Sequence, residues 1–549
     1  MEAGDVRDHE TIPGTSYVID EAHKSNKQRR GNSNIILHPQ PSTDPNDPLN
    51  WSKFRKEYQY ALVWMWSFIL AVAVNWVGPV YTVMQESYNA TLNQMNISSA
   101  LCYLFLGVGC VILQPIAMKI GRRPVYIFGT LLNILGNGIL AGANTIGKLY
   151  ASNVLCGMAA APVDSLVQIS ITDIFYLHEH GRRLAMYMFS LYAGSYLGPV
   201  AAGYIYEGQG TWKWCAYWLI IISGGLLVVQ FFTMDETLFK RDPELVQSNV
   251  EDELSREKEA NILVNETEVG ANDDNNNKTT ASGAGTVEVF MKEPPPPKTY
   301  VQRLKVFSPE HGSNKNIAKL FWMPFPTLRY PAVSWCAVVY GVQICWLSLL
   351  SITQAQFFES PPYNFSADTA GLTNFAALIG GFIGMIYAGW TDHFQLWMTK
   401  RNNGYFEPEF RLWTLTVAGT LNTAGLLMYG LGVSYGQHWM LPVVGIALIA
   451  FGIDACGTIT MTYAVDSYPS QTANTMVIIL FVRNLLGTLF TFVFQYWLDG
   501  LGINATTGML AAICFVANWS FIVFIIWGKK FRRWTASWYY SSIETALDD

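Results

Sequence analysis

Two acidic residues, Asp164 and Asp454, lie inside stretches that are otherwise apolar enough to cross a membrane. A charge at the bilayer centre costs at least about 2.5 kcal/mol, so each carboxylate needs a partner, water or a function. Arg483 is the deep basic residue of these stretches, and its expected depth is close to that of Asp454. The sequence therefore predicts a structural ion pair between Asp454 and Arg483. Without that pair, Asp454 is free to bind substrate or a proton.

Asp164 has no obvious basic partner in the sequence. Burial disfavours the charged form of a carboxylate, so we expect Asp164 to bind a proton, or to exchange that proton for a cationic substrate. The alternative is a protonated Asp164 that donates a hydrogen bond to a neighbouring helix. Gln168 lies one helical turn further along and shares the same face.

Aromatic and amide side chains in other apolar stretches could complete a cation site, because a desolvated Trp face attracts an ammonium group by about 1–2 kcal/mol. The candidates are Asn75, Trp76, Gln343 and Trp346. The alternative for each is ordinary helix packing. No zinc spacing, nucleophile elbow or hydrolase-type carboxylate pair appears, so we expect no enzyme, no metal and no cofactor.

The elements that position these residues follow from composition. The chain has 549 residues, 51% hydrophobic and 14% charged, with a mean hydropathy of +0.20. About 20 apolar residues suffice to span a bilayer as a helix. We therefore expect an all-α integral membrane protein. Its twelve predicted spans are 58–83, 99–118, 124–143, 149–172, 184–206, 214–234, 332–356, 370–391, 411–434, 440–465, 473–497 and 506–528.

Basic residues indicate the orientation, because Lys and Arg collect on cytoplasmic loops. They precede the first span, follow the last and occupy alternate loops, so both termini are predicted to be cytoplasmic. The opposite loops contain N-x-S/T, the acceptor triplet for N-glycosylation. The predicted glycosylation sites are Asn89, Asn96, Asn364 and Asn504.

The predicted spans divide six and six around a polar stretch that contains NDDNNNKTTASGAG and EPPPP. Such a composition cannot bury enough apolar surface to fold alone. We expect a cytoplasmic tail, a six-helix bundle, a largely disordered cytoplasmic linker, a second six-helix bundle and a second cytoplasmic tail. Their boundaries are 1–57, 58–236, 237–331, 332–528 and 529–549.

The two groups of spans look like repeats. The fourth span of each group ends in an aspartate, Asp173 or Asp466, and carries Asp164 or Asp454 deeper in. Parallel halves with substrate at their interface are a recurring transporter plan. We therefore expect the two deep aspartates to face one cavity between the halves.

Several motifs resemble those of fungal members of the major facilitator superfamily, in the twelve-span drug:proton antiporter group. DPNDPLNWSKFRK (44–56) resembles the pre-membrane motif of that group, and KIGRRP (119–124) resembles the end of its loop motif. GSYLGPVAAG (194–203) is similar to the antiporter motif of the fifth span, and RNNGYFEPEFRL (401–412) to a loop of the second half. IPGTS and the SPPYNFS loop look closest to permeases that take up histidinol and polyamines.

The resemblance implies a major facilitator fold whose halves rock around a central cavity. It implies a hinge at Gly194, Gly198, Pro199 and Gly203, and a cytoplasmic gate in which Arg122 and Arg123 latch onto acids such as Asp173 and Asp466. The alternative for the two arginines is anchoring at the membrane surface.

Asn153 stands where the antiporter group commonly has an arginine that is tied to proton coupling. Its absence leaves Asp164 less neutralised, which suits a cationic substrate. We therefore expect a monomeric plasma-membrane transporter of small organic cations, such as polyamines or histidinol-like amines, that is coupled to protons and has no nucleic-acid partner. The alternatives are a proton-antiport efflux pump for drugs or metabolites, and a non-transporting nutrient sensor on the same scaffold.

Overall fold

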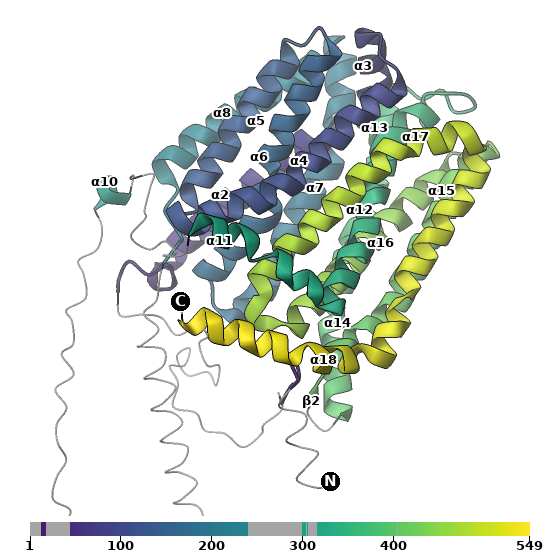
Figure 1. Ribbon diagram of the computed structural model, residues 1–549. Helices are drawn as coiled ribbons and strands as arrows, with labels where there is room; N and C mark the ends of the chain where they lie inside the picture. Colours follow the sequence, from purple (N-terminus) through teal and green to yellow (C-terminus); the bar gives the residue numbers. More distant parts are fainter. Residues whose placement is uncertain are drawn as a thin grey trace, which may run out of the picture.

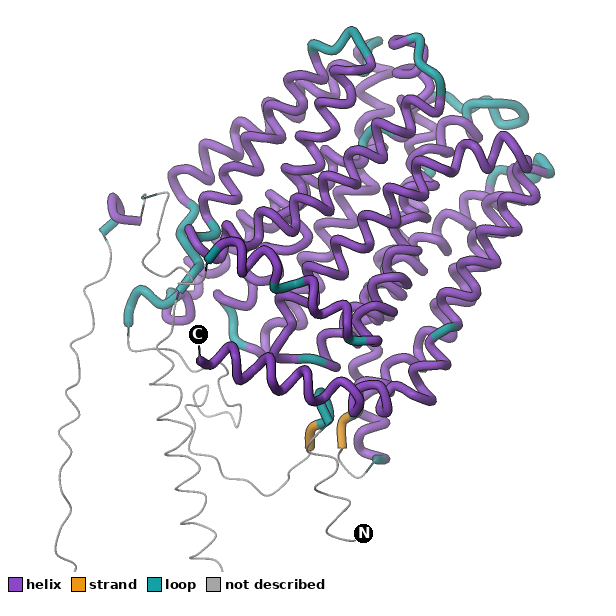
Figure 2. Tube along the Cα trace, viewed as in Figure 1, coloured by secondary structure: helices purple, strands orange, loops and turns teal. Residues whose placement is uncertain are grey.

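The computed structural model describes residues 12–17, 44–239, 299–303, 305, 316–402 and 405–548, and these residues are predominantly helical. Two bundles of long helices lie side by side (Figures 1 and 2). The N-terminal half comprises α2 (Lys53–Asn75), α3 (Tyr81–Tyr88), α4 (Leu92–Ile120), α5 (Arg123–Ala141), α6 (Ile146–Ile174), α7 (Leu177–Gln209) and α8 (Lys213–Thr233).

The C-terminal half comprises α12 (Pro331–Phe358), α13 (Ala367–Leu372), α14 (Asn374–Arg401), α15 (Leu415–Ser434), α16 (Met440–Ser467), α17 (Thr472–Trp519) and α18 (Phe521–Asp548). Short 3-10 helices accompany the bundles at Pro48–Asn50, Gly78–Val80, Phe325–Arg329, Pro408–Thr414 and Pro469–Gln471. Most of the expected linker, 240–298, lies outside the described residues. On its C-terminal side, the short helices α10 (Tyr300–Arg303) and α11 (Ile317–Trp322) precede the second bundle.

Nine helical stretches among the described residues are long and apolar enough to cross a membrane. The last stretch, Pro469–Ser542, contains two of the expected spans. Gly502, with a positive φ of +73°, breaks α17 between these two spans. The expected span 184–206 falls within α7 (Leu177–Gln209). The expected span 411–434 covers α15 and the end of the 3-10 helix before it, and neither α7 nor α15 is among the nine. The chain is therefore a multi-span helical membrane protein.

Small residues allow the helices to approach closely. The halves meet where α4 packs on α17 and where α7 packs on α13 and α14. A Cβ atom added to Gly194 or Gly203 of α7 would lie 2.5 Å from the Phe68 carbonyl oxygen or 2.6 Å from the Ala367 carbonyl oxygen. Gly198 packs on α2, and the Pro199 carbonyl oxygen approaches Gly371 of α13. The helix α7 therefore packs closely against α2 of its own half and against α13 of the other half. The predicted hinge at these glycines and Pro199 stays a prediction.

Residues 12–17 of the expected N-terminal tail dock onto the C-terminal half. β1 (Ser16–Tyr17) pairs antiparallel with β2 (Tyr405–Phe406). Gly14 has a φ of +75° and contacts the end of α16, where a Cβ atom would lie 2.5 Å from the Asp466 carbonyl oxygen. The buried Arg532 guanidinium donates to the Pro13 carbonyl at 2.6 Å and forms two hydrogen bonds to Glu409, at 2.7 and 2.8 Å. The IPGTS stretch is therefore a structural part of the second half.

We predict that Arg532→Gln destabilises the protein, because it leaves the Glu409 carboxylate buried and unpaired. Removing one partner of a buried ion pair typically costs about 3–5 kcal/mol. The thermal unfolding temperature of the detergent-purified protein should fall by several degrees. Arg533→Gln is the matched control, since Arg533 is the exposed neighbour of Arg532. Equal melting temperatures for the two variants would contradict the role given to the Arg532 contacts.

One of the predicted glycosylation sites is wrong. Asn96 lies inside α4, is 2% exposed, and accepts a hydrogen bond from the Tyr81 hydroxyl at 2.5 Å. A side chain buried in this way cannot carry a glycan in the folded protein. Asn89, Asn364 and Asn504 are exposed, so they remain candidates.

Candidate functional site

An ion pair joins the two halves at the centre of the protein. Arg483 of α17 donates through Nη2 to Oδ2 of Asp164 on α6. The side chains of Asp164 and Arg483 are 8% and 6% exposed. The predicted partnership between Asp454 and Arg483 is therefore wrong, and so is the expectation that Asp164 is unpaired. Similar depth on adjacent helices does not suffice for pairing, because Arg483 faces the opposite half.

The guanidinium of Arg483 is held by further contacts. Its Nη1 donates to the Tyr340 hydroxyl at 3.0 Å, and its Nη2 also donates to Oδ1 of Asn484 at 3.3 Å. The guanidinium carbon lies 4.8 Å from the centre of the Tyr340 ring, a cation–π distance. Among the described residues, Oδ1 of Asp164 accepts no hydrogen bond, so one oxygen of this carboxylate is available to a ligand.

Asp164 and Arg483 line a cavity between the halves, and we call it the central cavity. Its walls come from α2, α4, α6 and α7 of the first half and from α12, α16 and α17 of the second. Polar groups contributed by Asn75, Tyr103, Tyr192, Ser195, Tyr340 and Asn484 interrupt a wall that is otherwise largely Leu, Ile, Val and Ala. A mostly apolar chamber with a few convergent polar groups is the usual form of a small-molecule site.

Asp454 of α16 is 0% exposed and does not line the central cavity. It packs against the glycine face of α14, where a Cβ atom on Gly381 would lie 2.3 Å from its Oδ2. Tyr192 and Tyr196 of α7 interact with it electrostatically across the boundary between the halves. Neither carboxylate oxygen makes a well-formed hydrogen bond among the described residues. Burial of a charged carboxylate without a partner is costly, which makes Asp454 a candidate site for a proton.

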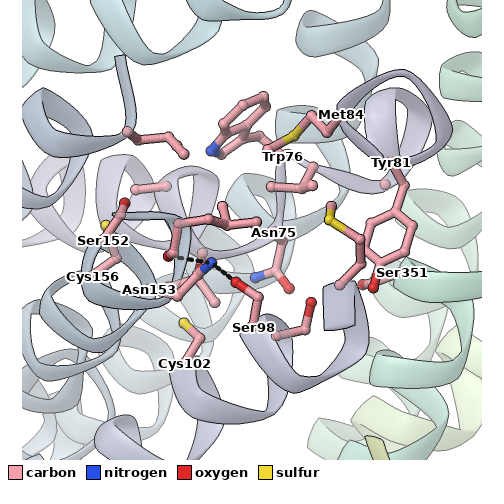
Figure 3. A pocket seen from close by; sticks show the side chains of 18 of the residues that line it. Asn75, Trp76, Tyr81, Met84, Ser98, Cys102, Ser152, Asn153, Cys156 and Ser351 are labelled. Atoms are coloured by element: carbon pink, nitrogen blue, oxygen red, sulfur yellow. Dashed lines mark hydrogen bonds between the residues drawn. The ribbon is translucent and has the colours of Figure 1, made fainter. Parts of the chain in front are cut away.

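A second cavity adjoins the central cavity, and we call it the side pocket. Figure 3 shows side chains that line it, which come mainly from α2, α3, α4, α5 and α6, with a contribution from α12. Asn153 donates a hydrogen bond to the Ser98 hydroxyl at 2.5 Å on one wall, and Trp76 lies on another. Val74, Asn75 and Tyr103 line both cavities, so the two spaces share a wall.

The remaining predicted ligands divide into two groups. Asn75 and Trp76 line the side pocket, as a ligand role requires. Gln343 and Trp346 do not line either cavity. Gln343 is completely buried in the C-terminal half, where it donates to Asn518 and accepts from Asn422. Trp346 packs on Phe490. The positions of Gln343 and Trp346 support ordinary helix packing, the alternative to a ligand role.

Gln168 is 6% exposed and lies one turn beyond Asp164 on α6. It does not line either cavity, so the structure leaves it without contact to the candidate site.

Among the described residues, the contacts of the predicted cytoplasmic gate residues do not cross between the two bundles. Arg122 contacts Asp173 at 2.5 Å, which ties the start of α5 to the end of α6. Arg123 donates to backbone carbonyls of Phe231 and Arg303. In the second half, Asp466 contacts Arg411 at 3.4 Å. Because none of these contacts joins one bundle to the other, they brace each half, and a gating role stays a prediction.

The opposite end of the bundles carries a polar contact that does cross between the halves. The Thr82 hydroxyl on α3 donates to the carboxylate of Glu359, at the end of α12, at 2.5 Å. Burial raises the pKa of Glu359, the nearby Glu207 and Glu86 raise it further, and the Thr82 hydrogen bond opposes them. No pattern in the sequence indicates this contact, because Thr82 and Glu359 are far apart in the chain.

The helical pair of bundles, with a cavity between them and no second folded domain among the described residues, defines a membrane transporter of the two-half type. Residues 63–491 match the Major Facilitator Superfamily, and the chain belongs to that family. The resemblance seen in the sequence motifs is thereby confirmed.

Two fungal relatives align over nearly their whole length. The chain is 31% identical to an uncharacterized MFS-type transporter of Schizosaccharomyces pombe, over 98% of this chain and 96% of the relative. It is 30% identical to Protein HOL1 of Saccharomyces cerevisiae, over 98% of each chain. The human organic anion transporter MFSD10 (TETRAN) has a similar fold, with a TM-score of 0.53 and 12% identity over 85% of this chain and 99% of that structure.

Proposed function

We propose that the protein is a proton-coupled, plasma-membrane transporter of small organic cations, such as polyamines or histidinol-like amines, that works as a monomer by alternating access. It crosses the membrane twelve times, and both termini are cytoplasmic. The observation that carries this proposal is the central cavity, which lies between the two halves and presents the Asp164 carboxylate. A site at this boundary is exposed to alternate sides when the halves rock.

The lining of the central cavity suits an ammonium group. Arg483 is the basic residue among those that line it, and the guanidinium is already engaged with Asp164 and Tyr340. Oδ1 of Asp164 is left to accept from a substrate ammonium, and Tyr103, Tyr192 and Tyr340 offer ring faces and hydroxyl groups nearby. An ammonium that binds Asp164 weakens the hold of Arg483, because both cations then share one carboxylate. Substrate binding thus loosens a contact that joins the halves.

Proton coupling rests on Asp454. Its carboxyl group is buried beside α7 at the boundary between the halves, and neither of its oxygens has a hydrogen-bond partner in the described part of the chain. A proton neutralises it while the halves are closed there, and separation of α7 from α14 admits the water that accepts this proton. A net proton movement would accompany each transport cycle.

Efflux of drugs or metabolites by proton antiport is the second candidate. The apolar wall of the central cavity, which includes Leu70, Leu106, Leu191 and Ile344, favours it. An apolar substrate would use this wall and leave the Asp164–Arg483 pair closed. The direction of transport separates the two candidates.

The test is uptake of radiolabelled spermidine by cells that express the protein and by matched cells that lack it. We expect saturable uptake that requires the protein and collapses when the proton gradient is dissipated. Absence of added uptake, with the protein shown at the cell surface, would contradict the cation proposal. Lower retention of a preloaded apolar compound in expressing cells would instead support efflux.

A further inference from the structure

The side pocket contains buried acceptor atoms that nothing in the protein satisfies. Oδ1 of Asn75 and Oδ1 of Asn137 have no hydrogen-bond partner among the described residues, and these side chains are 9% and 1% exposed. Buried polar atoms in proteins almost always have a partner, so two orphans in one pocket need an explanation.

The hydrogen bonds of the two amides fix which atom of each is left over. The Asn75 nitrogen donates to the Ala71 carbonyl and to the Ser195 hydroxyl, both at 3.1 Å. The Asn137 nitrogen donates to the Asn133 carbonyl at 2.9 Å. Both nitrogens are therefore used, and the free atoms are carbonyl oxygens, which only accept. What the pocket lacks is a hydrogen-bond donor.

The rest of the lining agrees with a donor that carries positive charge. None of the side chains that line the side pocket is a Lys, Arg, Asp or Glu, so no fixed cation repels an ammonium there. The rings of Trp76 and Tyr81 lie on its wall (Figure 3). Aromatic faces attract an ammonium group once water is removed.

The side pocket is placed to hold one end of a molecule whose other end is in the central cavity. Asn75 lines both spaces, and Tyr103 forms a second part of the shared wall. Asn137 lines the side pocket alone, so a ligand with one ammonium at Asp164 reaches the Asn137 oxygen only if it is elongated and carries a second donor at its far end.

We propose that the side pocket is a second subsite for the far donor group of an elongated amine, such as an α,ω-diamine or an amino alcohol. Oδ1 of Asn75 and Oδ1 of Asn137 accept from that group, and the pocket thereby selects substrates by length. This inference rests on the proposed transport of organic cations, and it adds a residue-level account of substrate choice.

The test measures inhibition of labelled substrate uptake by linear α,ω-diamines of increasing length, each compared with the monoamine of the same length. In the wild-type protein we expect the diamine to exceed its matched monoamine in potency by about tenfold or more, above a threshold length, which is the effect of one good charge-assisted contact. A diamine and monoamine of equal potency at every length would overturn the subsite while leaving cation transport intact. Wild-type cells with no amine uptake at all would instead contradict the proposed function.

Asn137→Leu is the sharpest variant, because Asn137 lines the side pocket and not the central cavity. We expect it to bring the diamine-to-monoamine potency ratio close to one. Asn144→Leu, at an exposed asparagine of the same half, is the matched control and should keep the wild-type ratio. An unchanged ratio in Asn137→Leu would overturn the proposal. If that variant is absent from the cell surface, the comparison of diamines with monoamines in the wild-type protein still tests the proposed subsite.

Discussion

Asp164→Asn is expected to abolish organic cation uptake, by more than about tenfold, which corresponds to a loss of at least about 1.4 kcal/mol of binding or transition-state stabilisation. The amide keeps the size of the side chain, but it removes the charge that holds both Arg483 and the substrate ammonium. Uptake of labelled substrate, normalised to surface protein, measures the effect. Asp499→Asn, at an exposed aspartate, is the matched control.

A structural effect of the same change can be separated from a loss of substrate binding. Asp164→Asn leaves the Arg483 guanidinium buried without a counterion, which typically costs about 3–5 kcal/mol of stability. The double variant Asp164→Asn with Arg483→Gln removes both charges, so we expect it to recover thermal stability and surface level but not uptake. If the double variant also regains uptake, Asp164 holds the halves together and does not bind the substrate.

The sequence predicts the architecture well for a simple physical reason. The length and apolar content of each stretch are local properties, and a bilayer of fixed thickness converts them directly into helices. The predicted break between the last two spans coincides with the kink at Gly502. The linker boundaries remain a prediction, since most of that region lies outside the described residues.

The contacts of the site were predicted less well, because they depend on how helices are rotated and not on how deep a residue lies. Depth alone paired Arg483 with Asp454, whereas the guanidinium faces Asp164, 319 residues away in sequence. The same limitation applies to Gln343, whose amide turns into the C-terminal half. A periodic polar stripe identifies the polar face of one helix, but the sequence does not say which helix that face meets.

The orphan oxygens of Asn75 and Asn137 illustrate a second limit of prediction from sequence. Their residue types are ordinary in membrane helices, where asparagine commonly joins neighbouring helices by hydrogen bonds. Only the contacts of each amide nitrogen show that the oxygens are unused. Satisfaction of polar atoms is a property of the whole packed structure, and no spacing rule in the sequence reports it.

Asp454→Asn is expected to separate transport from its proton dependence. An amide at this position resembles the protonated carboxyl group in shape and charge, so the halves should still close with α7 against α14. The groups that face this position are the Tyr192 and Tyr196 phenols of α7, the Tyr340 phenol of α12 and the glycine face of α14. Among them the carboxyl group is the strongest acid, so the proposed coupling assigns the proton to it.

The measurement compares two modes of transport in proteoliposomes that contain the purified protein. Exchange of labelled for unlabelled substrate needs no net proton movement, and we expect Asp454→Asn to retain it. Accumulation driven by a pH gradient needs a titrating group, and we expect the variant to lose this accumulation and the pH dependence of transport with it. Gly381→Ala is the packing control, because a Cβ atom there would lie 2.3 Å from Oδ2 of Asp454 and disturb the same contact without removing the acid. Gradient-driven accumulation that persists in Asp454→Asn would place the coupling proton elsewhere, and the buried Asp164 carboxylate at the boundary between the halves is the next candidate.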